Sequence, residues 1–264
     1  MDKARLISGI LMALLVTGLI LFAPDMPLWF VFNIIISLCC FEFIRLRFSN
    51  LTASIWSISF FALAYLIKDL LMFNLIFITL SFSLWIFLIP LILAFPHNKS
   101  FLQSPKAWIL FGVISFLGFS AGVNLILFNQ FALSPEFNIR GILLFIICIA
   151  AFTDVFAYFI GKSLGKRKFL QNVSPKKTLE GFIGGVVVAS LFLSISISIS
   201  KEVSFVPVLL LILITSIFSI IGDASASLFK RVSGTKDSSN LIPGHGGIFD
   251  RIDSHLAAFP VFLF

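Results

Sequence analysis

The chain is a series of long apolar runs separated by short polar connections. Because a helix needs about 20 apolar residues to cross a bilayer, these runs predict an all-α, polytopic membrane protein with about nine transmembrane helices. A transmembrane barrel would instead need segments of about ten residues that alternate in polarity. Run 203–222 is apolar on every face, which argues against a barrel. The nine predicted segments are 6–23, 28–44, 53–67, 71–95, 107–128, 141–161, 180–199, 203–222 and 255–264.

Some of these segments depart from a simple crossing. Segment 71–95 is long enough to tilt or to break near Ser81 to Ser83, and segment 53–67 is short for a full span. The last run has ten residues, so we expect either a half span or a chain that naturally continues further. The first run follows a basic start but exceeds a signal-peptide core and lacks a small-x-small cleavage pattern, so it is predicted to be a membrane helix.

Lys and Arg are distributed unevenly among the connections. Sixteen of the nineteen lie at the amino terminus or in every second connection after it, and only Lys68, Arg140 and Lys201 lie in the others. Cytoplasmic loops collect basic residues, so the amino terminus and both large polar loops are predicted to face the cytoplasm. The net charge of +7 is explained in this way, together with anionic lipid, and nucleic acid is not an expected partner.

Composition supports a single membrane domain over residues 1–264. Hydrophobic residues make up 59% of the chain, and 34 residues are phenylalanine. Since no linker or internal repeat divides the chain, we treat it as one domain. Within it we distinguish the amino-terminal helices (1–140) from the helices and cytoplasmic loops (141–264) that carry the candidate catalytic residues given below. Cys39, Cys40 and Cys148 lie inside apolar runs and are interpreted as packing residues rather than disulfide partners.

The first large polar loop, residues 153–185, begins with a carboxylate inside an apolar run. Asp154 there costs about 3 kcal/mol to insert, so it requires a cation, a partner or a water-filled site. Tyr158 lies one helical turn later on the same face. The basic cluster 166–168 is interpreted as a contact with lipid headgroups. The block that follows is predicted to bind phosphate: Ser174 or Thr178 can cap a helix start, Lys176 and Lys177 pair with phosphate, and Glu180 enters the bilayer.

The second polar stretch, residues 222–254, holds four aspartates, four Lys or Arg residues and one His. If the preceding helix continues beyond residue 222, Asp223, Ser227, Lys230 and Arg231 form one stripe at spacings i, i+4, i+7 and i+8. Carboxylate and hydroxyl oxygens suit a divalent metal, and the cations suit phosphate oxygens.

The same stretch ends in a glycine-rich turn and further charges. His245 lies among glycines whose backbone N–H groups can approach an anion, so its side chain is predicted to face a cavity. Zinc spacing and nucleophile triads are both missing from the sequence. Carboxylates, cations and glycine together favour phosphoryl transfer with magnesium. The remaining candidate residues are Lys236, Asp237, Asp250, Arg251 and Asp253.

At these residues the sequence resembles a known family. The pattern S-x-F-K-R-x4-K-D-x-S-x2-I-P-x-H-G-G-I-x-D-R-I-D, over residues 227–253, closely resembles the signature of the CDP-diacylglycerol synthases, also called phosphatidate cytidylyltransferases. Asp154 with Ala157, Tyr158 and Gly161, and the block 174–181, also resemble that family, although Leu179 stands where relatives often carry Trp. The resemblance covers about residues 140–264, and the first five predicted spans match only in being apolar.

The resemblance implies a transferase of phospholipid biosynthesis in the inner (cytoplasmic) membrane. Such an enzyme joins CTP and phosphatidate into CDP-diacylglycerol and pyrophosphate at a site facing the cytoplasm. It further implies Mg²⁺ held by Asp223 and Asp250, potassium as a second cation, and a homodimer. The small-residue face of Gly181, Gly184 and Gly185 suits helix packing within one chain or between two. The implied reaction site comprises Asp223, Ser227, Lys230, Arg231, Lys236, Asp237, His245, Asp250, Arg251 and Asp253.

Two other hypotheses stay open at this point. One keeps the chemistry but replaces phosphatidate with an ether-linked lipid phosphate, as in the related CDP-archaeol synthases. The other is a secondary transporter for an anion, with Asp154 and Glu180 as coupling carboxylates. A transporter of that kind predicts inverted repeats and broken helices, and the sequence shows neither.

Overall fold

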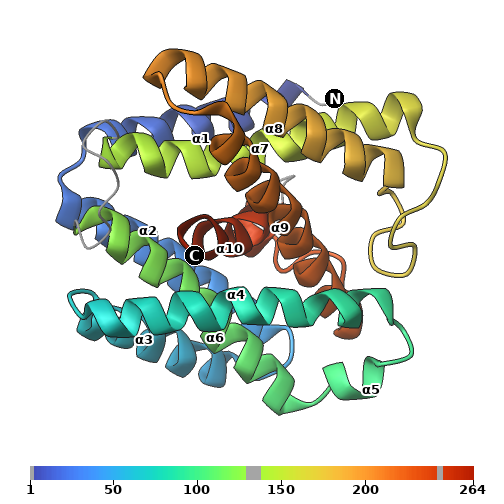
Figure 1. Ribbon diagram of the computed structural model, residues 1–264. Helices are drawn as coiled ribbons and strands as arrows, with labels where there is room; N and C mark the ends of the chain where they lie inside the picture. The colour runs from blue at the N-terminus through green and yellow to red at the C-terminus, as the bar shows by residue number, and fades with distance from the viewer. Residues whose placement is uncertain (1–2, 129–137, 243–245) are drawn as a thin grey trace.

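The computed structural model describes residues 3–128, 138–242 and 246–264, which form ten α-helices and no β-strand (Figure 1). Each of the nine predicted segments forms a helix, and the short α5 was not predicted. The helices are α1 (Lys3–Phe22), α2 (Asp25–Arg45), α3 (Asn50–Ile67), α4 (Leu71–Leu93), α5 (Lys99–Leu102), α6 (Pro105–Leu127), α7 (Ile139–Leu164), α8 (Leu179–Lys201), α9 (Phe205–Val232) and α10 (Phe249–Leu263).

Seven of these helices are long and apolar enough to cross a membrane, namely α2, α3, α4, α6, α7, α8 and α9. This confirms the polytopic helical class. The described residues do not confirm nine crossings, because α10 has only 15 residues. Many large apolar side chains are exposed on the outer faces, as expected for a surface that contacts lipid.

Of the two alternatives expected for segment 71–95, a tilt or a break near Ser81 to Ser83, the break is excluded, because α4 is continuous. Its hydroxyl groups form hydrogen bonds within the helix: Thr79 donates to the Leu75 carbonyl and Ser83 donates to the Thr79 carbonyl, each at 2.9 Å. Ser81 is buried and accepts a hydrogen bond from the Trp85 indole. Hydroxyls satisfied locally in this way need no water inside the membrane, so they do not interrupt the helix.

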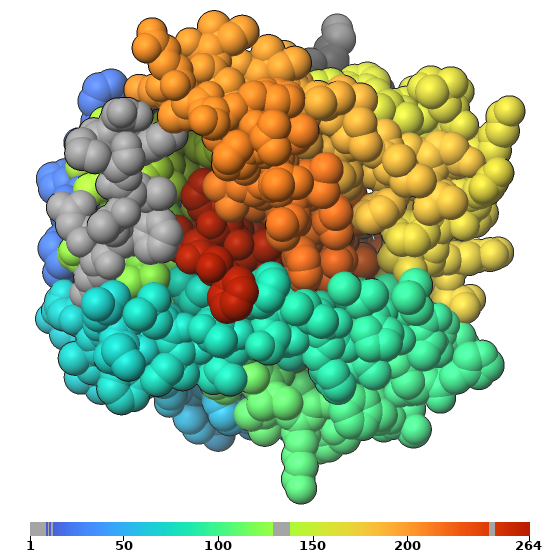
Figure 2. Space-filling view, viewed as in Figure 1, coloured from blue at the N-terminus to red at the C-terminus, as the bar shows by residue number. Residues whose placement is uncertain are grey.

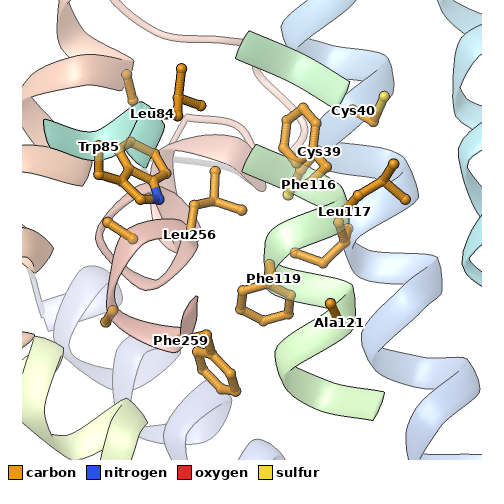
Figure 3. Packing of buried hydrophobic residues seen from close by; sticks show 14 of the residues in the cluster. Cys39, Cys40, Leu84, Trp85, Phe116, Leu117, Phe119, Ala121, Leu256 and Phe259 are labelled. Carbon is orange, nitrogen blue, oxygen red and sulfur yellow. The ribbon is translucent and has the colours of Figure 1, made fainter. Parts of the chain in front are cut away.

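Helix α10 lies in the middle of the bundle (Figure 1) and packs against α2, α4, α6, α7 and α9. Leu256 and Phe259 of α10 are at most 1% exposed and lie near Phe119 of α6 in the core (Figure 3). In the space-filling view the carboxyl-terminal segment, in red, shows only as a small patch between α4 and α9 (Figure 2). A helix too short to span the bilayer is thus buried by longer neighbours.

The basic connections lie together at one end of the bundle. Arg47, after α2, donates to the Gln103 carbonyl, between α5 and α6, at 3.2 Å. Asn172, between α7 and α8, donates to the Phe95 carbonyl, after α4, at 3.1 Å. Arg231, near the end of α9, donates to the Val173 carbonyl at 3.2 Å. These contacts support the alternation that the charge pattern predicted.

The glycine face of α8 packs within the chain. A Cβ atom at Gly185 would lie 2.6 Å from the Ala157 Cβ of α7, and one at Gly184 would lie 2.6 Å from the Ile160 side chain. Gly181 contacts the same helix. Small residues here allow close backbone approach between α7 and α8, so this face is used inside one chain.

A buried polar network joins α2, α4 and α6. The Trp29 indole donates to Asn124 Oδ1 at 2.6 Å, and Asn124 Nδ2 donates to Asn74 Oδ1 at 2.9 Å. Asn74 also donates to the backbone carbonyl of Ile67. Without water in the apolar interior, these groups depend on each other for hydrogen bonds.

The network predicts the effect of Asn124→Ala. Removing the central amide leaves the Trp29 N–H and the Asn74 carbonyl oxygen without this partner, so we expect the unfolding free energy to fall by about 1–2 kcal/mol. Thermal unfolding in detergent measures this change. Ser196→Ala, which removes one exposed hydroxyl bonded within α8, is the control. An unfolding midpoint equal to that of the control would contradict the role given to the network.

Candidate active site

Helix α9 carries the polar stripe beyond the apolar segment. The helix continues to Val232, ten residues past the predicted end, so the prediction of a helical stripe is confirmed. The Ser227 hydroxyl contacts Asp223 Oδ1 at 3.4 Å, which places both on one face. Lys230 lies in the last turn, where a cation interacts favourably with the helix dipole.

Polar residues from α7, α9, α10 and the loop before α10 surround one cavity of about 320 Å³. Six of the lining side chains are charged residues that the sequence predicted for the reaction site on the second stretch alone, and Asp154 joins them from α7. The polar ends of three helices therefore converge on one space. The lining residues are Asp154, Asp223, Lys230, Asp237, Asp250, Arg251, Asp253 and Ser254.

Asp250, in the first turn of α10, is the most extensively held carboxylate of the cavity. Its Oδ1 pairs with Lys230 Nζ at 2.5 Å, and its Oδ2 accepts from the backbone N–H groups of Ser238 and Gly247, both at 2.9 Å. Burial alone would raise the pKa of Asp250, but the hydrogen bond and charge of Lys230 outweigh burial and hold this pKa below its usual value. Asp250 is therefore a fixed anion at neutral pH.

Asp223 pairs with a lysine from the first polar loop. Lys177 Nζ lies 2.5 Å from Asp223 Oδ2. Burial would lower the pKa of Lys177, but the charge of Asp223 outweighs burial and raises that pKa above its ordinary value. Lys177 therefore keeps its positive charge and links the loop between α7 and α8 to α9.

Asp154 has the partner that its position in an apolar run required. Its Oδ2 accepts a hydrogen bond from the Ser254 hydroxyl of α10 at 3.1 Å. The side chain also lines the polar cavity, as expected for a carboxylate that reaches water. Asp154 thus joins α7 to the site.

The glycine-rich turn contacts an anion of the protein itself. Gly246 has a positive φ of 83°, and the Gly247 N–H points at Asp250. A Cβ atom at Gly247 would lie 2.0 Å from the Ser238 hydroxyl oxygen, so no other residue fits there without displacing it. The expected approach of backbone N–H groups to an anion is present, and the anion is the Asp250 carboxylate. His245 lies outside the described residues.

The block 174–181 divides between the site and its support. Only Lys177 reaches a cavity residue. Thr178 caps α8 by accepting from the Gly181 N–H, and Glu180 accepts from the N–H groups of Lys166 and Arg167. Ser174 forms part of the turn through its backbone, and Lys176 is exposed. Ser174, Lys176, Thr178 and Glu180 thus belong to the loop and to the start of α8, which they support.

Three further candidates, like Ser227, are not among the residues that line the cavity. Arg231 contacts the carbonyls of Val173 and Thr235 and thereby braces the loop before α8. Lys236 is exposed next to Asp237, and Tyr158 is exposed with Lys162 5.9 Å from its ring centre.

The sequence analysis did not single out Ser254, which lines the cavity, or two residues that hold the groups around it, Glu42 and Ser238. Glu42 of α2 and Ser238 hydrogen-bond to each other at 2.9 Å, and Ser238 also contacts Asp250. A signal for Glu42 was present, because it is a lone carboxylate inside the apolar run 28–44, as Asp154 is inside its own run. The partner of Glu42 could not be deduced, since it lies 196 residues away.

The donor chemistry of the cavity fits a divalent cation. Five carboxylates line it, opposed by Lys230, Arg251 and the nearby Lys177, which leaves two negative charges when all are ionised. Burial and then the negative charge of Asp223 raise the pKa of Asp253, and a cation would relieve the repulsion between these two carboxylates. Among the described residues, however, no three Asp, Glu, His or Cys side chains form a ready metal-binding group. Lysine nitrogens pair with the carboxylates of Asp223 and Asp250.

Three known proteins are similar to this sequence over part of their length. The chain is 37% identical over 186 residues to a phosphatidate cytidylyltransferase of Haemophilus influenzae, covering 68% of this chain and 64% of the relative. It is 44% identical over 123 residues to that of Bacillus subtilis, covering 46% of each chain. It is 36% identical over 182 residues to that of Pseudomonas aeruginosa, covering 67% of this chain and 64% of the relative. The matches thus span about half to two thirds of these relatives.

The model of the cytidylyltransferase family matches residues 3–264. This match includes the amino-terminal helices, which the motif resemblance did not reach, together with every residue that lines the cavity. The chain therefore belongs to the cytidylyltransferase family.

Proposed function

We propose that this protein is a phosphatidate cytidylyltransferase, which joins CTP and phosphatidate into CDP-diacylglycerol and pyrophosphate. The observation that carries the proposal is the single cavity that five carboxylates and two basic side chains line, with Lys177 paired to one of those carboxylates. Transfer between two polyanions needs such a site, because the reactants repel each other unless charge is neutralised.

The reaction needs little help from a base. The second pKa of a phosphate monoester is about 6, so phosphatidate is largely a dianion at neutral pH. One of its oxygens attacks the α-phosphorus of CTP and forms the new P–O bond. The bond between that phosphorus and the bridging oxygen breaks, and pyrophosphate leaves with the electron pair.

Basic side chains of the site supply the positive charge that this step needs. Lys230 and Arg251 line the cavity, and Lys177 reaches it through Asp223. In our proposal these groups bind phosphate oxygens and stabilise the negative charge that develops in the transition state. Lys236, exposed beside the cavity residue Asp237, would attract the incoming nucleotide.

Asp223 and Asp250 are the residues that would hold Mg²⁺, with potassium as a second cation of the site. When bound, the metal would neutralise triphosphate charge and stabilise the leaving pyrophosphate. The role of the chain is to place these two carboxylates: Asp223 by the continuous α9, and Asp250 by the first turn of α10.

The setting of the proposed reaction is the inner face of the cytoplasmic membrane. The basic connections share one end of the bundle with the cavity, which supports a cytoplasmic active site and amino terminus. Phosphatidate would stay in the bilayer while CTP enters from the cytoplasm. A homodimer belongs to the proposal, with an interface other than the glycine face of α8, which packs on α7.

The proposal predicts release of pyrophosphate from CTP by the purified protein in detergent micelles that contain phosphatidate. Turnover should require Mg²⁺ and stop with EDTA, because the site carries an excess of negative charge. Ether-linked lipid phosphate in place of phosphatidate tests the other lipid class. Turnover in micelles, which hold no gradient, would exclude the transporter hypothesis. If the protein releases pyrophosphate with neither phosphatidate nor the ether-linked lipid phosphate, the proposed function is overturned.

Asp223→Asn and Asp250→Asn should each lower turnover by about 10³-fold or more, because each removes a charge worth several kcal/mol in the transition state. Both variants should still insert and fold. Asp69→Asn, in the connection between α3 and α4, removes a carboxylate far from the cavity and is the control. Retained turnover in either site variant would refute the metal assignment.

Two adjacent lysines offer a sharper comparison. Lys177 pairs with Asp223, whereas Lys176 is exposed. Losing a hydrogen bond between charged groups costs about 1.5–3 kcal/mol, so Lys177→Ala should lower kcat/KM by about 10–100-fold. Lys176→Ala should cost much less. Equal losses in the two variants would show that the whole block, rather than Lys177 alone, serves the substrate.

A further inference from the structure

Glu42 is a buried carboxylate of α2 that meets the catalytic half of the chain. It is 4% exposed and lies in a helix with an otherwise apolar run. Its Oε1 accepts from the Ser239 hydroxyl at 2.6 Å and from the Ile248 N–H at 3.2 Å. Its Oε2 accepts from the Ser238 hydroxyl and from the Phe249 N–H, each at 2.9 Å.

All four donors come from the segment that leads into α10. Each carboxylate oxygen accepts two hydrogen bonds, so the capacity of Glu42 is used by protein groups, and metal or substrate is not needed to satisfy it. The residue that precedes α10, Ile248, supplies no side-chain cap. Glu42 supplies the missing cap from another helix, and its negative charge suits the positive end of the α10 dipole.

Ser238 and Gly247 connect Glu42 to Asp250. The Ser238 hydroxyl lies 2.9 Å from Glu42 Oε2 and 3.1 Å from Asp250 Oδ2, and the Ser238 N–H donates to Asp250. A Cβ atom at Gly247 would lie 2.3 Å from Glu42 Oε2, so the turn approaches Glu42 as closely as a backbone can. The two carboxylates hold opposite sides of one turn.

We propose that Glu42 is a positioning residue, which fixes the start of α10 so that Asp250 faces the cavity in the orientation that a divalent cation requires. This inference rests on the proposed function. It assigns a task to the amino-terminal half, which contributes no lining residue to the cavity in the described part of the chain. Glu42 is not among the residues that line the cavity and acts through Ser238 and the backbone of the turn.

The test is binding of Mn²⁺, followed by electron paramagnetic resonance in the full-length protein in detergent without substrates. Glu42→Gln keeps the size of the side chain but turns an amide N–H₂ toward two donors, so the turn should lose its fixed geometry. Loss of a residue that orients a metal ligand typically costs 10–100-fold, so we expect Mn²⁺ affinity to fall by about that factor. Turnover should fall with it, and more Mg²⁺ should be needed for half-maximal activity.

A matched control separates positioning from general loss of stability. Asn33 is also buried on α2, donates to the Trp29 carbonyl and accepts from the Ser120 hydroxyl, far from the turn. Asn33→Ala should lower the unfolding midpoint and leave Mn²⁺ affinity unchanged. A purely structural Glu42 would give the same result as Asn33→Ala.

If Glu42→Gln does not fold, Ser238→Ala tests the positioning role instead, because it removes only the hydroxyl that lies between Glu42 and Asp250. We expect about tenfold weaker Mn²⁺ binding in that variant. Unchanged Mn²⁺ affinity in the folded variant would overturn the inference, as would a wild-type protein without a Mn²⁺ site. Failure of the proposed function is recognised separately, because the wild-type protein would then release no pyrophosphate from CTP.

Discussion

A carboxylate held at the edge of an apolar helix bundle must have a cation or a hydrogen-bond donor beside it, and the whole site follows from this constraint. Asp250 has Lys230, Asp223 has Lys177 and Asp154 has Ser254. Each of these contacts joins two different helices or loops. The requirement that buried charge be paired therefore also fixes how the polar ends of α7, α9 and α10 meet.

The central position of α10 explains how a short helix can hold its site residues in fixed positions. Its apolar face is enclosed by five longer helices, and Phe249 at its start is fully buried beside Phe43 of α2, 5.5 Å between ring centroids. Phe43 also packs on Phe229 of α9 at 5.3 Å. Aromatic packing thus holds the start of α10 and the end of α9 together, one residue away from Asp250 and Lys230.

The amino-terminal helices support the site instead of lining it. The sequences of these helices do not reveal this supporting role, because a helix in a membrane is apolar whichever neighbour it packs against. Yet α2 contributes both Phe43 and the neighbouring Glu42, an apolar contact and a hydrogen-bonded carboxylate that meet the same segment. The family match over residues 3–264 includes these helices together with every residue that lines the cavity.

The sequence alone determined the helical membrane class, the order of the main helices, the alternation of basic connections and the residues of the second polar stretch. These properties depend on apolar run length, charge and spacing within a few turns, all of which are local. Tertiary structure decided that Lys177 and not Lys176 reaches Asp223, that Glu180 binds its own loop, that the glycine turn holds Asp250, and that Glu42 caps α10. Those contacts join residues separated by up to 207 positions, and they are selected by packing and by the cost of unpaired buried charge, which no local pattern records.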